Sequence, residues 1–493
     1  MGQESEVVMR GKHQKRKGLF RKGELIALGV MISFVLILFA VTGSFAVIKN
    51  TFFPQHNLAT FKTGQSVQII SDDKTNKLEK YKNWIGEITS ITAKQTNKKY
   101  LYTYRITFDN GKVLKAVKAK FLKNAPKAAY SKNTLIQIAS NAETDSDGYS
   151  LVEFRGKVAH IDKVHPNYAN NDGGYLYDVS LKEDGRTITN ITESALTSLY
   201  QIALKQDNSA SQNNEALRQA FDYARAHPET ILAFPSGKFD IGSSNPEKDY
   251  QQLPSDTQLY GNETKLNIQG RIYWLGFATG AGATEGVKNF SMSYIDFIAD
   301  NLTEGNQFMI MANHGDNWQI KHNSFTMVQK KGSHIFDLGG LQNSIFDSNQ
   351  FIGYAPELTE ISEIPSGSDL HDYYAEAIQI DASDNSGIWD GGILQQVDAN
   401  YSQNNPSKQL SSNITISNNS FLPYSDSAGN IIAYSASIGQ HSSEVGEITV
   451  YGNTFTSSLV SRYPEAQTEW VMKPIHFPEI SASKVVNYDN ITN

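Results

Sequence analysis

Two acidic residues in the stretch 333–381 have the sequence surroundings of a paired-carboxylate site. Asp337 lies between two apolar residues, and Asp381 directly follows Ile380. Because side chains alternate along a strand, buried apolar neighbours leave both acids on the outward face. If the two segments stack as neighbouring strands, the carboxylates would lie roughly 5–10 Å apart, the range in which paired carboxylates cleave glycosidic bonds. The alternative is that each is a surface acid on a solvated strand.

Further polar and aromatic residues accompany this pair. Glu376 begins the segment that ends at Asp381, and His334 precedes Asp337. We expect these four as the catalytic set, one carboxylate being the acid and the other the base or nucleophile, with histidine able to transfer protons. The expected substrate-binding residues are polar groups that could contact sugar hydroxyls and aromatics that could stack on sugar rings: Gln379, His371, His441, Tyr373, Tyr374 and Trp389. Turn positions for the histidines and packing for the aromatics are the alternatives.

The composition of the 493-residue chain excludes several kinds of site. There is no cysteine, so disulfides, thiolate metal ligands and cysteine nucleophiles are excluded. No histidines and acids have the tight spacing of a zinc motif, and we predict no metal site. The net charge of -7 argues against nucleic acid as the main partner. A large exported protein without cysteine suits a Gram-positive bacterial surface.

The N-terminus resembles a membrane anchor in its charge pattern. Residues 1–24 are basic, and residues 25–48 carry no charge. A helix of that length is about 36 Å long, enough to span a bilayer. The basic flank predicts a cytoplasmic tail, an uncleaved transmembrane helix and an extracellular remainder, hence a single-pass protein of the cell membrane. A cleaved signal peptide is the alternative.

Two segments with alternating polarity follow, 60–125 and 130–199, and they share sequence patterns at offsets of 69–74 residues. Asn110-Gly111 and Asp184-Gly185 are tight hairpin signals in corresponding places. Five short strands in about 65 residues predict a small barrel in each segment. Both resemble bacterial SH3-like domains, which implies binding to cell-wall polymer or polysaccharide. A spacer role is the alternative.

Residues 206–482 have the pattern of a solenoid. Apolar positions 217, 220, 221 and 224 fall at helical spacing and predict a helix that caps the first coil. A nonapeptide ending in phenylalanine then recurs, with Phe-to-Phe spacings of 28, 26, 70 and 34 residues. An asparagine two residues before the phenylalanine is expected to form a hydrogen-bonded turn ladder; the four are Asn323, Asn349, Asn419 and Asn453. These repeats predict stacked coils with phenylalanine and isoleucine inside.

The predicted helix, a strand and a Phe-Pro-Ser-Gly-Lys-Phe segment lie within residues 217–241, and the Asn-x-Phe coils follow them. In these features the chain resembles the pectin-lyase-like superfamily of right-handed parallel β-helices over roughly residues 200–480. The expected fold is thus all-β, with a β-helix preceded by two SH3-like barrels and one transmembrane helix. The resemblance implies action on an extracellular polysaccharide or cell-wall polymer.

The known motifs of this superfamily leave the activity open. The Asn-Thr-Asp and Gly-His-Gly motifs of polygalacturonases and the Asp-Pro-His-Asp motif of mannuronan epimerases are absent. We expect a glycoside hydrolase that needs no cofactor. A polysaccharide lyase, which could use calcium, and a non-catalytic polysaccharide-binding protein are the alternatives.

Overall fold

The computed structural model describes thirteen stretches of the chain in full and the backbone of two further strands. The full stretches are 58–71, 77–96, 99–168, 173–245, 249–277, 286–299, 306–329, 333–354, 375–383, 409–440, 444–457, 473–477 and 484–493; the two strands are 387–390 and 393–396. The chain divides into two compact units, one of residues 1–130 and 163–177 and the other of residues 131–162 and 178–493.

The first N-terminal module is a five-stranded sheet with the order β4-β3-β2-β1-β5. Its elements are β1 (Ser66–Ile69), β2 (Ile85–Gln95), β3 (Tyr100–Thr107), β4 (Val113–Lys118), β5 (Leu122–Asn124) and the 3-10 turns Glu79–Tyr81 and Ala119–Phe121. Aromatic residues fill its interior: Tyr104 and Phe108 are buried, and Trp84 packs edge-on against Phe108. The expected tight turn joins β3 to β4, where Gly111 has a φ of +78°.

The second module repeats this strand order as β10-β6-β7-β8-β9. Its elements are β6 (Leu135–Ile138), β7 (Val158–Pro166), β8 (Tyr175–Leu181), β9 (Thr187–Thr192), β10 (Leu196–Ser198) and the 3-10 turns Val152–Phe154 and Glu193–Ala195. The hairpin between β8 and β9 turns at Gly185, with a φ of +70°. The shared order agrees with the repeat seen in the sequence. The likeness to SH3-like domains and the predicted domain bounds remain predictions.

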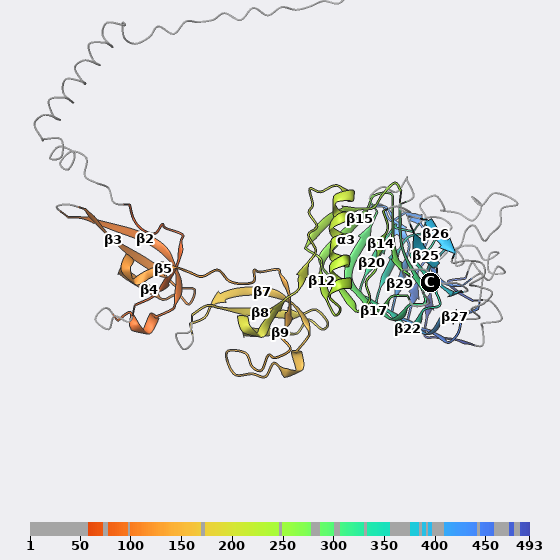
Figure 1. Cartoon of the computed structure of the whole chain (residues 1–493), viewed down its shortest axis with the longest axis horizontal. Helices are drawn as coiled ribbons and strands as arrows, with labels where there is room; N and C mark the ends of the chain where they lie inside the picture. The colour runs from red at the N-terminus through yellow and green to blue at the C-terminus, as the bar shows by residue number, and fades with distance from the viewer. Residues whose placement is uncertain are drawn as a thin grey trace, which may run out of the picture. The chain divides into compact units, whose positions relative to one another are not determined.

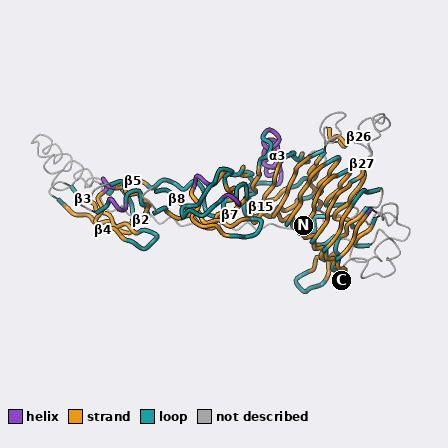
Figure 2. Tube along the Cα trace, turned by 90° about the horizontal axis from the view of Figure 1, so that it is seen from below, coloured by secondary structure: helices purple, strands orange, loops and turns teal. Residues whose placement is uncertain are grey.

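Residues after 199 form a parallel β-helix of stacked coils (Figures 1 and 2). A 15-stranded sheet has the main path β36-β33-β28-β22-β19-β17-β20-β23-β29-β34-β37, with β11, β12, β13 and β15 attached through β15 and β17. A second sheet has the order β14-β16-β18-β21-β24-β32-β35, with β27 paired to β24. Strands far apart in the sequence, such as β21 and β24, therefore lie side by side.

The strands of the β-helix are short, as expected for coils that turn after a few residues. In the first coils they are β11 (Tyr200–Gln201), β12 (Ile231–Ala233), β13 (Gly237–Ile241), β14 (Gln251–Gln252), β15 (Thr257–Ile268), β16 (Arg271–Gly276), β17 (Lys288–Ile298), β18 (Gln307–Asn313), β19 (Asp316–Lys321) and β20 (Ser324–Thr326). The middle coils hold β21 (Phe336–Gly339), β22 (Gln342–Asp347), β23 (Gln350–Ile352), β24 (Glu376–Ser383), β25 (Gly387–Asp390), β26 (Ile393–Gln396) and β27 (Gln409–Leu410).

The last coils continue the same two sheets. They hold β28 (Ser412–Ser417), β29 (Ser420–Leu422), β30 (Tyr424–Ser425), β31 (Ile431–Ala433), β32 (Ser437–Gly439), β33 (Ile448–Tyr451), β34 (Thr454–Phe455), β35 (Ile475–His476), β36 (Val485–Tyr488) and β37 (Ile491–Thr492). Strands β25 and β26 pair with each other, as do β30 and β31. The pairing of β36 and β37 with earlier coils extends the β-helix to Thr492.

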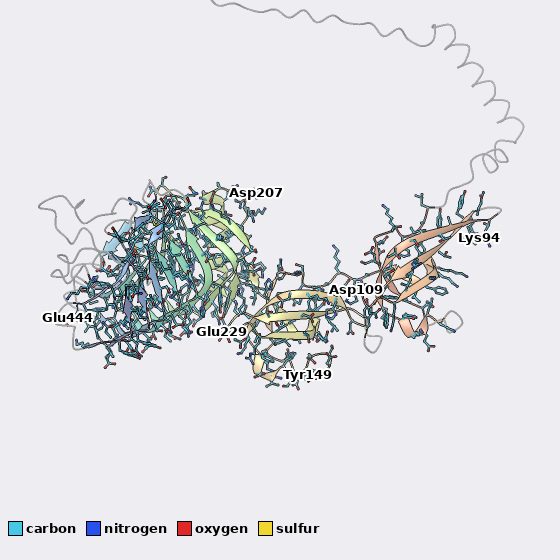
Figure 3. All side chains as sticks on the ribbon, turned by 180° about the vertical axis from the view of Figure 1, so that it is seen from behind. Lys94, Asp109, Tyr149, Asp207, Glu229 and Glu444 are labelled. Carbon is cyan, nitrogen blue, oxygen red and sulfur yellow. The ribbon has the colours of Figure 1, made fainter. Side chains whose placement is uncertain are left out.

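Two internal ladders explain why the sequence repeats. The phenylalanine rings of successive coils stack nearly parallel, with centroids 4.5–5.2 Å apart, in the order Phe297, Phe325, Phe351, Phe421 and Phe455. The side-chain amides of the predicted asparagines form a buried ladder in which each Nδ2 donates to the next Oδ1 at 2.9–3.1 Å. This confirms the predicted turn ladder and adds Asn490 as its last member. Figure 3 shows how densely side chains fill this part of the molecule.

Helix α3 (Ala210–Ala226) precedes the first complete coil. Ser209 begins it with a capping box, since its hydroxyl accepts from the Gln212 N–H and the Gln212 side chain accepts from the Ser209 N–H. The four predicted apolar positions, Leu217, Ala220, Phe221 and Ala224, are all buried in the core of the β-helix. The cap predicted from their spacing is therefore confirmed.

The membrane part of the predicted fold needs correction. Within the residues that the structure describes, none of the helices has the length and apolarity needed to cross a bilayer. The described residues therefore give a mainly β fold with a parallel β-helix, and neither the predicted transmembrane helix nor a single-pass membrane location is supported. The predicted segments 1–24 and 25–48 lie outside the described residues.

Candidate functional site

The predicted acid pair lies on one face of the eight-stranded sheet, on neighbouring coils. Strand β21 pairs with β24 in a parallel register that sets Asp337 opposite Gln379, and Gly339 opposite Asp381. Their neighbours, such as Phe336 and Ile380, point into the core. The two acids are thus one strand and two residues apart, which separates their Cβ atoms by about 8 Å. Both acids are half-buried, whereas Gln379 is only 5% exposed.

A β-bulge at the start of β24 changes the direction of Glu376. Simple alternation places Ala377 on the outward face, but Ala377 is fully buried in the core. The register with β32 shifts here, because Glu376 pairs with Ser437 and Ile378 pairs with the next residue. One extra residue in β24 moves Glu376 onto the same side as Gln379 and Asp381. Alternation counted back from Ile378 and Ile380 therefore gives the wrong side for Ala377.

Glu376 forms a buried pair with His476, a residue that the sequence analysis missed. His476 Nε2 lies 2.5 Å from Glu376 Oε1, and both side chains have no exposed surface. The two residues come from β24 and β35, with β32 between them. Gly439 on β32 makes the contact possible, because a Cβ there would lie 2.5 Å from His476 Cδ2 and Nε2. A larger residue at 439 would displace the ring.

The hydrogen bonds of His476 fix the number of protons in this pair. His476 Nδ1 lies 2.7 Å from the backbone oxygen of Lys473, which can only accept, so Nδ1 carries a proton. The Nε2 contact with Glu376 then needs one more proton, either as imidazolium and carboxylate or as neutral imidazole and carboxylic acid. A buried contact of this kind holds one proton between two groups.

His334 is oriented by the same glutamate. Its Nδ1 donates to the backbone oxygen of Glu376 at 3.1 Å and lies 3.7 Å from Oε2 of the same residue. The His334 side chain retains 12% exposure, in contrast to the fully buried His476. With Nδ1 as the donor, Nε2 is the nitrogen that accepts or returns a proton when the ring is neutral. Glu376 therefore positions His334.

Asp381 is held by donors on one of its oxygens. Its Oδ1 accepts hydrogen bonds from Gln440 Nε2 and from the Ala382 N–H, each at 2.8 Å. Its backbone oxygen accepts from the Ser411 hydroxyl at 2.6 Å. These contacts fix both the strand and the carboxylate, and they add Gln440 to the residues of the site.

Other predicted site residues cannot be placed. His371, Tyr373, Tyr374 and His441 lie outside the described residues, and only the backbone of Trp389, in β25, is described. Among the described residues, no three histidine, aspartate or glutamate side chains are arranged to hold a metal ion.

A sequence signal for His476 does exist. It lies between Ile475 and Phe477, which both pack against the core, so it alternates as Gln379 does between its isoleucines.

No protein-family description and no curated protein matches the chain. Among solved structures, the surface adhesin PfbA of Streptococcus pneumoniae is 19% identical, with a TM-score of 0.37 over 52% of this chain and 57% of the adhesin. The A-module of a mannuronan C-5 epimerase of Azotobacter vinelandii is 11% identical, with a TM-score of 0.27 over 59% and 76% of the two chains.

A variant of the tailspike protein of E. coli bacteriophage HK620 is also similar, at 12% identity and a TM-score of 0.25 over 54% and 49% of the two chains. This chain thus spans only part of the length of these proteins. Likenesses this distant assign neither a substrate nor an activity. The strand register in this molecule establishes the parallel β-helix.

Proposed function

We propose that the chain binds a polysaccharide across β21 and β24 and hydrolyses it with Asp337 and Asp381. The observation that carries the proposal is the register of these strands, which brings two outward carboxylates onto adjacent coils. Their Cβ separation of about 8 Å leaves room for a water molecule between a carboxylate and the sugar. Asp337, Asp381, Gln379 and Gln440 together supply the acids and amides that such a site needs.

Each acid has its own role in the proposed reaction. The Oδ1 atom of Asp381 is held by two donors, so we assign this carboxylate as the base that takes a proton from water. The water oxygen bonds to the anomeric carbon as the glycosidic C–O bond breaks. Asp337 gives its proton to the departing oxygen. Glu376 is fully buried and is therefore assigned a positioning role, through His334, in place of the predicted catalytic role.

The test is the release of new reducing ends when the full chain is incubated with a panel of neutral and acidic polysaccharides. Asp337→Asn and Asp381→Asn each keep the shape and remove the titrating group. We expect each to lower the rate by at least about a hundredfold, as loss of general acid or base catalysis does. Asp296→Asn is the matched control, because Asp296 is a half-buried outward acid on β17 in the other sheet. Its rate should stay within about twofold of the original.

Two other outcomes would redirect the proposal. An unsaturated product, detected by its ultraviolet absorbance, would make the protein a lyase in which a base removes a proton from the sugar ring. Binding without any new reducing end or unsaturated product would make it a non-catalytic polysaccharide-binding protein. Loss of activity in Asp296→Asn together with the other variants would contradict the assignment of Asp337 and Asp381.

A further inference from the structure

A second concave site lies away from the acid pair, on the outer face of the 15-stranded sheet. It has a volume of about 450 Å³ and is lined by β15, β17, β19 and Glu183 of the β8–β9 hairpin. That volume falls within the usual range of about 300–1,000 Å³ for small-molecule sites. The hairpin and the three strands belong to the same compact unit of the chain.

The floor of this pocket is built from two rows of outward side chains. Parallel register aligns one row of Gln258, Ser291 and Gln319, and a second row of Tyr260, Ser293 and Lys321. Alternation explains the arrangement, because the residues between them, such as Met292 and Ile320, are buried in the core. Three successive coils thus contribute hydroxyl and amide groups to one surface.

Several of these polar groups are available to a ligand. Within the described part of the chain, the side chains of Gln258, Ser291 and Ser293 and the hydroxyl of Tyr260 make no hydrogen bond to another residue. Lys321 Nζ, in contrast, donates to Gln319 Oε1 at 3.0 Å. A pocket that gathers hydroxyls and an amide without internal partners presents donors and acceptors for a hydroxylated ligand.

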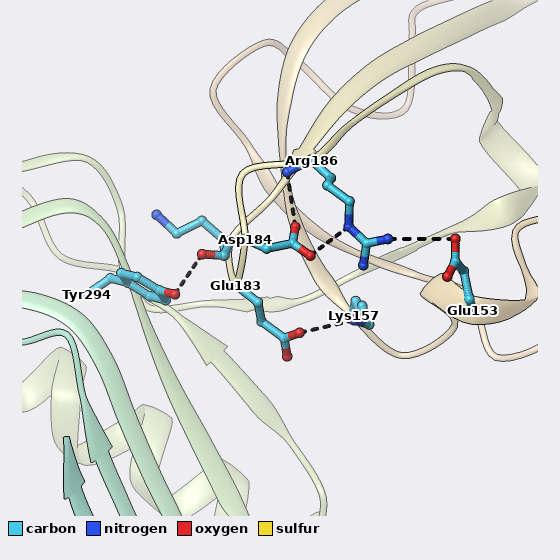
Figure 4. A network of polar contacts seen from close by, with 7 residues as sticks. Glu153, Lys157, Glu183, Asp184, Arg186 and Tyr294 are labelled. Carbon is cyan, nitrogen blue, oxygen red and sulfur yellow. Dashed lines mark hydrogen bonds and ion pairs between the residues drawn. The ribbon is translucent and has the colours of Figure 1, made fainter. Parts of the chain in front are cut away.

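An aromatic wall borders the polar rows. The rings of Tyr260 and Tyr294 are 6.2 Å apart and those of Tyr294 and His322 are 5.1 Å apart, both pairs nearly parallel. Tyr294 is fixed from the hairpin side, since its hydroxyl donates to the Lys182 backbone oxygen at 2.6 Å and Lys182 Nζ lies 4.6 Å from its ring centroid (Figure 4). The wall is therefore apolar and held in place before any ligand binds.

The acids beside the pocket have cationic partners in the protein. Glu183 pairs with Lys157 at 3.2 Å, and the neighbouring Asp184 pairs with Arg186 at 2.6 Å (Figure 4). Burial raises the pKa of Tyr260 to about 12, with help from the Glu183 charge and from Tyr294, so its hydroxyl is a neutral donor at ordinary pH. Lys321 is the exception, because among the described residues its ammonium group donates only to the neutral Gln319 amide. The rest of the lining is mainly neutral and polar, which favours a neutral, hydroxylated ligand.

We propose that this pocket is a second, non-catalytic binding site for a neutral saccharide segment. Hydroxyls and amides on three coils would contact the sugar hydroxyls, and the tyrosine and histidine rings would contact its apolar surface. The proposal deepens the function proposed above and rests on it for the class of ligand. It does not rest on the two acids, because no residue of the pocket belongs to that site.

The test measures binding of the full chain to an array of neutral and acidic oligosaccharides, followed by titration with the neutral oligosaccharide that binds best. Ser291→Trp fills the floor of the pocket, and Thr449→Trp is its matched control, because Thr449 lies in the same outward row four coils farther on. We expect Ser291→Trp to weaken binding by at least about tenfold, equivalent to the loss of one or two hydrogen bonds. Thr449→Trp should leave binding unchanged.

The outcomes distinguish failure of the proposed binding pocket from failure of the proposed hydrolase activity. Asp337→Asn should keep saccharide binding in the pocket, and Ser291→Trp should keep hydrolysis of short substrates within about twofold. Equal melting temperatures of the two tryptophan variants would show that filling the pocket leaves the fold intact. Binding of acidic oligosaccharides alone, no binding of neutral ones, or full binding by Ser291→Trp would each overturn the proposal. Absence of hydrolysis by the unaltered chain would overturn only the proposed function.

Discussion

Replacing His476 by leucine should be one of the most damaging single changes in the β-helix. The variant leaves Glu376 fully buried and removes the partner that lies 2.5 Å from its Oε1 atom. For the imidazolium–carboxylate form, removing one partner of a buried ion pair costs about 3–5 kcal/mol, because the remaining charge has lost its compensation. For the neutral form, the loss is that of a buried carboxyl group left without its hydrogen bond. At about 2–4 °C per kcal/mol for a large domain, the melting temperature should fall by roughly 6–20 °C.

The double variant Glu376→Leu with His476→Leu tests whether the stability loss in His476→Leu comes from the unpaired glutamate. Replacing both partners of a buried pair by apolar residues is often neutral or stabilising, so the double variant should be more stable than His476→Leu alone by about 2 kcal/mol or more. Thermal unfolding measures the difference, and hydrogen exchange of β24 and β35 shows whether the loss is local, as expected for a solenoid. Lys265→Leu, at an exposed position of β15, is the control and should change stability by less than about 0.5 kcal/mol.

Two results would refute this reasoning about the pair. A loss below about 1 kcal/mol for His476→Leu would mean that the glutamate is not buried with a partner in the way described. A double variant whose loss equals the sum of the two single losses would mean that the two side chains contribute independently.

Two further predictions concern the coils. Asn419→Ala removes the hydrogen bonds that Asn419 makes with Asn349, Asn453 and the Phe346 backbone oxygen, and should cost roughly 2–4 kcal/mol in urea unfolding. Asn413→Ala removes a single exposed hydrogen bond, from Asn413 Nδ2 to Asn343 Oδ1, and should cost less than about 1 kcal/mol. Burial acts to raise the pKa of Asp347, but hydrogen bonds from Ser417, Asn418 and Ser348 outweigh it and lower that pKa overall. The stability from Asp347 is therefore present above the unfolded-state pKa and is lost as the pH falls through the folded-state value. Urea unfolding between about pH 5 and pH 2 should show this loss, and Asp347→Asn should remove that part of it.

The fold could be predicted because its stabilising contacts repeat in the sequence. The stack from Phe297 to Phe455 and the asparagine ladder from Asn323 to Asn453 repeat once per coil, so spacing alone reveals them. Alternation likewise places Asp337 on the outward face, because Phe336 and Leu338 beside it are both core residues.

The contacts within the site depend on strand register, that is, on which residues of neighbouring strands lie opposite each other. The alternation of apolar and polar residues in the sequence does not determine this register. The bulge at Ala377 redirects Glu376, and the small size of Gly439 lets His476 reach across a strand. Neither effect repeats from coil to coil, so neither leaves a period in the sequence. The pocket beside Tyr294 also depends on the fold, because Lys182 is 112 positions away along the chain.

The predicted membrane-spanning helix near the N-terminus is not supported by the structure. Length and charge pattern favoured a membrane-spanning helix at 25–48, but no helix in the described part of the chain could cross a membrane. Neither the membrane anchor nor the Gram-positive origin is supported by the findings. The account of the β-helix depends on neither.

The most direct test of the proposed hydrolysis is the configuration of the first product, followed by nuclear magnetic resonance of the anomeric proton. Carboxylates whose Cβ atoms lie about 8 Å apart can hold their carboxyl groups at the separation of about 6.5–9.5 Å that accompanies inversion. We predict that the unaltered chain releases the inverted anomer and that Asp337→Asn and Asp381→Asn release at least about a hundredfold less in the same time. A retained anomer, or full activity in either variant, would contradict the assignment of these two carboxylates as acid and base.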